Sequence, residues 1–174
     1  MRLSIPVSCA LAVAIAAPVS LAQSPIQTAP SANLPAGGLL RGGAGIADDG
    51  EHLWAIGQDW RAEMLADRIE FTPYLGELEP VTRHLGYRLT AVGRDDSMRP
   101  AAAPTRRVVD GLEVTFERGD VREVYEAKPE GLKQSFVFAT KPAGSGDLVV
   151  RGQLSADMDL VSATTTELVF HGVC

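Results

Sequence analysis

Cysteine is scarce in this chain of 174 residues, which contains only Cys9 and Cys174. Cys9 lies in an N-terminal apolar run with the pattern of a signal peptide, so export would leave Cys174 as the single thiol. No disulfide within the exported chain is then possible, and the fold must depend on its apolar core. The remaining length is sufficient for one domain of ordinary size.

Motifs for catalysis and for metal binding are also missing. The three histidines, His52, His84 and His171, are scattered, and no His-x-x-x-His or Cys-x-x-Cys spacing is available to hold zinc. No Gly-x-Ser-x-Gly sequence offers an activated serine. We therefore predict no catalytic, cofactor-binding or metal-binding residues, no cofactor, and a protein that is not an enzyme.

Acidic residues occur in pairs that need a separate interpretation. Asp48-Asp49, Asp95-Asp96 and Asp157-x-Asp159 lack the alternating oxygen ligands of an EF-hand loop, and we predict solvated turns there. Glu123 and Glu126 have the residue type of a glycosidase pair. The prediction is instead that both lie on the solvent face of a strand.

Clustered positive charge is absent as well. The formal net charge is −6, and acidic and basic residues alternate along the chain. Binding to nucleic acid requires a basic face, and attachment to anionic lipid requires a polybasic patch, so neither partner is expected. The remaining partner classes are an unidentified protein or a glycan.

The N-terminus carries the one targeting signal. Arg2 precedes an apolar run that ends in small residues at Ser20 and Ala22, which is typical of a secretory signal peptide cleaved after Ala22. The run is interrupted by Pro6 and Pro18 and is too short for a membrane span. We predict a signal peptide at 1–22 and a secreted, periplasmic or cell-surface protein with no stable membrane insertion.

The next segment, 23–50, is rich in Pro, Gly and Ala and has few large apolar residues. Such a composition buries too little surface to offset the entropy of ordering, which predicts a flexible lead-in. The folded domain is predicted at 51–174.

Alternation of apolar and polar residues dominates this domain. Strands are predicted at 54–64 and 68–74 and in GYRLTAVG (86–93), where Tyr87, Leu89 and Ala91 oppose Arg88, Thr90 and Val92. A polar loop without period is predicted at 93–105. DWRAEMLADRIE is the best helical alternative, but no window has a convincing 3.6-residue period. The prediction is an all-β fold, an antiparallel β-sandwich.

The second half has stronger hairpin signals. Gly119-Asp120 predicts a two-residue turn, and Pro129-Glu130-Gly131 predicts a three-residue turn with Gly131 in the left-handed region. The last strand is predicted at Glu167–His171, close to the end of the sequence. An edge strand there would be unprotected, so it is either inserted centrally or the sandwich is incomplete at its C-terminus.

Aromatic residues offer one candidate binding surface, formed by Trp54, Trp60, Tyr74 and Tyr125. Exposed, they would stack on a sugar or a protein partner; buried, they would fill the core, which is the more common use. Gly57, between the two tryptophans, is interpreted as a bulge or a close backbone approach.

The chain from about residue 52 to about residue 171, and most clearly the segment from Leu112 to Met158, resembles a β-rich N-terminal region of large exported bacterial proteins, of the kind common in planctomycetes and myxobacteria. The resemblance depends on Glu123 and Tyr125, on a turn with glycine followed by Leu-x-Gln-x-Phe, and on GDLVVRGQL at 146–154. In that family FG-GAP (integrin-α-like) or similar repeats often follow. No such repeat is present here, so the resemblance implies an exported β-rich module and no repeat-borne function.

These features predict a non-catalytic exported β-sandwich for surface or envelope interactions, an adhesion-type scaffold. One alternative is a carbohydrate-binding or carbohydrate-active domain that uses the aromatic residues. The other is an inactive N-terminal fragment of a larger repeat protein.

Overall fold

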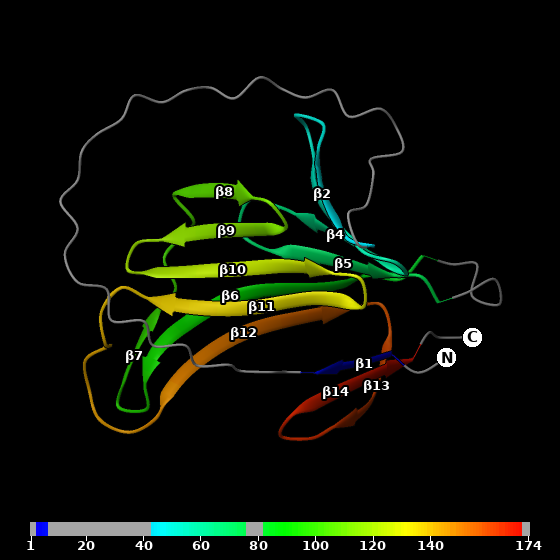
Figure 1. The fold of residues 1–174 in the computed structure, drawn as a ribbon. Helices are drawn as coiled ribbons and strands as arrows, with labels where there is room; N and C mark the ends of the chain where they lie inside the picture. Colours follow the sequence, from blue (N-terminus) through cyan, green and yellow to red (C-terminus); the bar gives the residue numbers. More distant parts are fainter. Residues whose placement is uncertain (1–2, 7–42, 76–81, 172–174) are drawn as a thin grey trace, which may run out of the picture.

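The computed structural model describes residues 3–6, 43–75 and 82–171. Every regular element in these ranges is a β-strand, and all of the strand pairs are antiparallel. The strands form three sheets (Figure 1). The prediction of an antiparallel all-β sandwich is confirmed, and the helical alternative at DWRAEMLADRIE is wrong.

The large sheet has seven strands, in the order β12-β6-β5-β4-β3-β2, and β7 pairs with the C-terminal part of β6. Its strands are β2 (Gly45–Asp48), β3 (Leu53–Ile56), β4 (Trp60–Met64), β5 (Ile69–Pro73), β6 (Leu85–Arg94), β7 (Ser97–Pro100) and β12 (Leu148–Ala156).

The four-stranded sheet follows the simple order β11-β10-β9-β8, in which each strand pairs with its neighbour in sequence. Its strands are β8 (Arg106–Asp110), β9 (Glu113–Arg118), β10 (Val121–Lys128) and β11 (Gly131–Phe138).

The small sheet has the order β1-β14-β13, formed by β1 (Leu3–Pro6), β14 (Glu167–His171) and β13 (Asp159–Ala163). The final strand has the predicted bounds. It lies in the centre of its sheet, which agrees with the first of the two predicted alternatives, central insertion. β1 falls within the segment predicted as a signal peptide, and cleavage of that segment stays a prediction.

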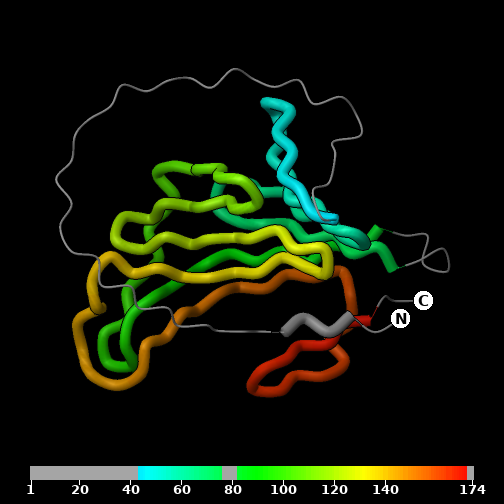
Figure 2. Tube along the Cα trace, in the orientation of Figure 1, coloured from blue at the N-terminus to red at the C-terminus, as the bar shows by residue number. Residues whose placement is uncertain are grey.

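The chain passes from the large sheet to the four-stranded sheet, returns through β12 and ends in the small sheet (Figure 2). The main core lies where the first two sheets face each other. From the large sheet it receives Leu53, Ala55, Trp60, Ala62, Met64 and Ile69, and from the four-stranded sheet Val114, Phe116, Tyr125 and Ala127. Two smaller clusters continue it, one around Leu89, Val92 and Val121 and one beneath the small sheet around Leu85, Met158 and Phe170.

A polar network is buried in this otherwise apolar interface. The Glu123 carboxylate accepts hydrogen bonds from Arg118 Nε at 2.8 Å, Tyr125 OH at 2.6 Å and Gln134 Nε2 at 2.8 Å. Glu123 is 1% exposed and Arg118 is 4% exposed. The prediction that Glu123 lies on a solvent face is therefore wrong. Glu123 and Glu126 are an odd number of positions apart on one strand, so their side chains leave opposite faces of the sheet.

The guanidinium of Arg118 also joins segments that are distant in sequence. It donates to the carbonyl oxygen of Asp67, in the β4–β5 turn of the large sheet, and to that of Ala102, both at 2.9 Å. Three of its hydrogen bonds thus end on three different segments. A charged group is stable in the interior only where its own hydrogen-bonding atoms have partners. These hydrogen bonds therefore help to fix the position of one sheet on the other.

The turn between β10 and β11 is attached to the large sheet by Trp60. Its indole Nε1 donates to the carbonyl oxygens of Lys128 and Pro129, each at 3.2 Å. The backbone N–H of Gln58 also donates to the carbonyl oxygen of Pro129, at 3.0 Å. A Cβ on Gly57 would lie 1.9 Å from Trp60 Nε1, so only glycine fits beneath the ring. The predicted close approach at Gly57 is confirmed, with the indole as the approaching group.

Gly57 also ends a strand, which corrects the prediction of one strand at 54–64. The segment forms two strands, β3 and β4, joined by residues 57–59. Strands at 45–48, 97–100, 106–110 and 159–163 were not predicted from the sequence. The first of these shows that the sheet begins before the predicted domain boundary at residue 51, and Ala44 is already buried.

Thr90 forms a β-bulge in β6, and after it the inward and outward positions of the strand change places. Arg151 pairs with Ala91 and Gly152 with Leu89, so Thr90 is skipped in the register with β12, although its hydroxyl donates to the carbonyl oxygen of Arg151 at 3.0 Å. Val92 therefore joins Leu89 in the core with 1% exposure. The prediction that these two residues lie on opposite faces is wrong because a bulge shifts the two-residue period by one position.

The two hairpin turns of the four-stranded sheet differ from each other. Gly119 has φ of +71° in a two-residue turn, as predicted. Lys128 pairs directly with Gly131, so that turn contains only Pro129 and Glu130, and Gly131 does not have positive φ. The predicted three-residue turn is wrong because proline fixes a turn position without needing glycine after it.

We expect Glu123→Ala to lower the free energy of unfolding by about 3–5 kcal/mol, because it leaves Arg118 buried without a counter-charge. Glu126→Ala, on the same strand but facing solvent, should change it by about 1 kcal/mol or less. Urea unfolding followed by circular dichroism measures both. Equal effects of the two substitutions would contradict a structural role for the buried pair.

Candidate functional site

The four aromatic residues considered as a candidate binding surface, with core packing as the more common alternative, do not lie together on one face. Trp60 and Tyr125 are 6% and 2% exposed, and both belong to the main core. Burial, followed by the negative charge of Glu123, holds the pKa of Tyr125 well above its usual range. Tyr74 is 58% exposed beyond the end of β5, and Trp54 is half-buried on the outer face of the large sheet.

Trp54 is surrounded by charged groups. The Arg61 guanidinium lies 5.1 Å from the centre of its ring, within the range of a cation–π contact, and the His52 ring lies at 6.0 Å. His52 Nδ1 is 2.6 Å from Glu63 Oε1. This hydrogen bond raises the pKa of His52. The cluster combines one aromatic ring with a carboxylate, an arginine and an imidazole on an open sheet face.

The acidic pairs that were considered as calcium ligands bind the backbone instead. Asp48 and Asp49 accept hydrogen bonds from the amides of residues 50–52, and Asp157 Oδ1 accepts from the amide of His84 at 2.6 Å. Within the described ranges no group of three or more His, Cys, Asp or Glu side chains is placed to hold a metal ion.

Asp95 and Asp96 form a clasp with the glycine-rich loop before β12. Asp96 accepts from both the amide and the hydroxyl of Ser145, the latter at 2.6 Å, and Asp95 accepts from the amide of Asp147 at 3.1 Å. Gly144 has φ of +104° and passes so close to Asp96 that a Cβ there would lie 2.5 Å from its Oδ1. The clasp joins the β6–β7 hairpin to the loop and accounts for this acidic pair.

The outer face of the four-stranded sheet carries an ordered arrangement of surface side chains. Pairing along β8–β11 aligns alternate outward residues into three rows that cross the strands. The middle row, here called the neutral strip, consists of Val108, Thr115, Val124 and Ser135. On one side lies the acidic row, Asp110, Glu113 and Glu126, with Lys133 at its end, and on the other side lies the arginine row, Arg106, Glu117 and Arg122, with Val137 at its end. We call the three rows together the outer face.

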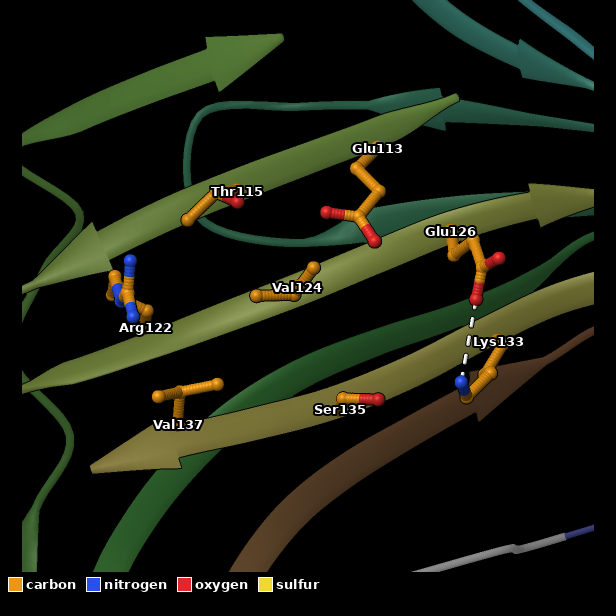
Figure 3. A pocket seen from close by; sticks show the side chains of 8 residues that line it. All are labelled: Glu113, Thr115, Arg122, Val124, Glu126, Lys133, Ser135 and Val137. Carbon is orange, nitrogen blue, oxygen red and sulfur yellow. Dashed lines mark hydrogen bonds and ion pairs between the residues drawn. The ribbon is translucent and has the colours of Figure 1, made fainter. Parts of the chain in front are cut away.

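Figure 3 shows the centre of this face, a shallow depression of about 270 Å³. Its floor is made by short side chains of the neutral strip. Glu113, Glu126 and Lys133 stand at one end and Arg122 stands at the other end (Figure 3). The depression exists because short β-branched and hydroxyl residues occupy the middle of strands whose ends carry long charged residues.

Charge is only partly compensated on this face. Glu126 forms ion pairs with Lys128 and Lys133, each at 3.3 Å. Partial burial opposes ionisation, but the two lysines outweigh it and hold the pKa of Glu126 below its ordinary value. Glu113 lies directly opposite both Asp110 and Glu126, and like charges in that position repel. Among the described residues, Asp110, Glu113 and Arg122 have no ion-pair partner.

The sequence predicted which residues of β9 point outward, but not the rows that cross the strands. The alternation of Glu113, Thr115 and Glu117 against Val114 and Phe116 was predicted correctly. The rows themselves were not predicted, because β8 was missed and because rows depend on register between strands. The signal available was the two-residue turn at Gly119, which fixes the pairing of β9 with β10.

None of the described residues belongs to a helix with the length and apolarity needed to cross a membrane.

We expect the clasp to loosen in acid. Hydrogen bonds from the Ser145 side chain and amide hold the pKa of Asp96 below its ordinary value of 3.8. A depressed pKa stabilises the folded form above pH 3.8 and loses that effect as the pH falls through the folded value. Hydrogen exchange of the Ser145 and Asp147 amides should therefore become faster relative to the core amides below about pH 3.8. Asp96→Ala should show this faster exchange at neutral pH. Asp110→Ala should not, because the Asp110 carboxylate has no ion-pair partner among the residues that the structure describes.

No family model, curated protein or solved structure matches this chain.

Proposed function

We propose that this chain is an exported, non-catalytic β-sandwich that binds a protein at the cell surface or envelope. The signal-peptide pattern at 1–22 supports export. The outer face of the four-stranded sheet supplies the binding surface. The observation that carries the proposal is the register of β8–β11, which places a neutral strip between two charged rows on a face that no described strand covers (Figure 1).

Two physical properties support this use of the outer face. Its centre consists of short neutral side chains, so a partner can approach closely without displacing charge. Its edges carry carboxylates and guanidinium groups without ion-pair partners, which orient a complementary surface and exclude an unmatched one. Interfaces of this kind have a less polar centre and a charged rim.

Filling the neutral strip tests the proposal. We expect Ser135→Trp to weaken binding of residues 23–174 to envelope fractions of the source cells by about fivefold or more, as for loss of a central interface contact. Ser162→Trp, on the exposed strand β13, is the matched control and should bind as the unmodified chain does. A Ser135→Trp protein that folds normally and binds with unchanged affinity would remove the outer face from the proposal.

A carbohydrate-binding function is the second candidate, and the position of Trp54 favours it. The half-buried ring lies on the outer face of the large sheet beneath the Arg61 guanidinium, with His52 and Glu63 nearby, and these groups together offer an aromatic ring and hydrogen-bonding groups.

Tryptophan fluorescence distinguishes this candidate. The chain contains two tryptophans, and Trp60 is buried, so a spectral change on adding a sugar would report on Trp54. We expect any such change to disappear in Trp54→Phe, which removes the indole and retains an aromatic ring. Sugar-dependent quenching that persists in Trp54→Phe would place the sugar elsewhere.

A further inference from the structure

We propose that the partner bound by the outer face is a second copy of this chain. The two copies would pack their four-stranded sheets face to face around a twofold axis that runs along the neutral strip. This inference rests on the proposed function, because it takes the outer face to be a partner surface, and it names the partner.

Strand β10 directs Arg122, Val124 and Glu126 outward, and Lys128 follows on the same face at the end of the strand. A twofold rotation about an axis across the strand at Val124 exchanges the positions of Arg122 and Glu126. Arg122 then faces Glu126 of the second copy, Glu126 faces its Arg122, and the two Val124 side chains meet. One strand thus contains a basic, an apolar and an acidic group in a self-complementary order.

The neighbouring strands follow the same rotation, because they are in register with β10. On β8, Asp110 faces Arg106 of the second copy, and Val108 meets its own symmetry mate. On β9 and β11, Thr115 and Ser135 meet their symmetry mates in the neutral strip. The rotation therefore places each acidic row over an arginine row and each neutral strip over a neutral strip.

The dimensions allow these contacts to form together. Arg122 and Glu126 are four residues apart, which is about 14 Å along a strand, and the same spacing recurs in the second copy. Sheets that pack face to face lie about 10 Å apart with nearly aligned strands. Arginine and glutamate side chains from opposite sheets can meet across this distance.

Two of the four strands do not add complementary contacts. On β9 the rotation brings Glu113 toward Glu117 of the second copy, and these carboxylates repel. On β11 it places Lys133 over Val137 of the second copy, so Lys133 gains no opposite charge there. Arg106 and Arg122 lie directly across from Glu117 on its neighbouring strands and reduce this repulsion. The flat area of the outer face is also only on the order of 300 Å², from four strands about 4.8 Å apart and five residues long. Both facts predict a weak, salt-sensitive dimer.

Sedimentation of residues 23–174 over a wide concentration range, with a reductant to keep Cys174 free, measures this association. We expect a reversible dimer that weakens as salt increases. Arg122→Glu and Glu126→Arg should each weaken it by about fivefold or more, because each reverses two symmetric pairs. The double variant R122E/E126R restores opposite charges across the axis and should return the affinity to within about twofold.

A gain of affinity provides a test that misfolding cannot imitate. Glu117→Lys replaces the opposing contact by an attraction to Glu113 of the second copy and should tighten the dimer by about fivefold. Glu130→Lys, in the exposed β10–β11 turn, changes the net charge equally and leaves the outer face unaltered. It should have no such effect.

A chain that stays monomeric at all concentrations, or a double variant that is no better than either single variant, would overturn the inference. The proposed function is tested by different outcomes from those that test the dimer. If the chain is monomeric but Ser135→Trp still loses binding to the envelope, the outer face binds a different protein and only the second copy is excluded. If Ser135→Trp changes neither association nor binding, both proposals are wrong.

Discussion

The buried ion pair between Arg118 and Glu123 is the interaction on which the arrangement of the two main sheets depends. A guanidinium and a carboxylate, each nearly without exposure, are stable in the interface only while every donor and acceptor is matched. Apolar contacts alone would let the sheets slide by small amounts at little cost. The hydrogen bonds from Arg118 to Asp67 and Ala102 are satisfied in the observed arrangement, and a shift of one sheet against the other would leave buried donors without acceptors.

A second attachment acts at the opposite end of β10. Trp60 reaches from the large sheet to the carbonyl oxygens of Lys128 and Pro129, so the β10–β11 turn is attached to the large sheet. The hairpin from 121 to 138 is therefore fixed at one end by the ion pair and at the other by the indole. A hairpin held at both ends presents its outward side chains as a rigid array, which reduces the entropy lost when a partner binds.

Local pattern predicted much of the fold, and contacts between distant segments explain the rest. The strands around Gly119 and the last strand at Glu167–His171 were predicted because alternation and turn residues are local signals. The bulge at Thr90 was not, because it results from pairing with β12, about sixty positions away. The burial of Glu123 was equally invisible, since a carboxylate is buried only if partners elsewhere in the chain donate to its oxygens, whereas core packing was already the more common use expected for Trp60.

The alignment of side chains on the outer face and the packing of the core both depend on one strand register. Gly119, with its positive φ, fixes the pairing of β9 with β10. A slip of one residue would turn Glu123 to solvent and Val124 and Glu126 toward the core, which would remove the buried pair and the neutral strip together. The order of charges on the outer face is thus maintained by the stability of the interior. Substitutions on the outer face, in contrast, leave the register unchanged, so its binding properties can change while the sandwich is retained.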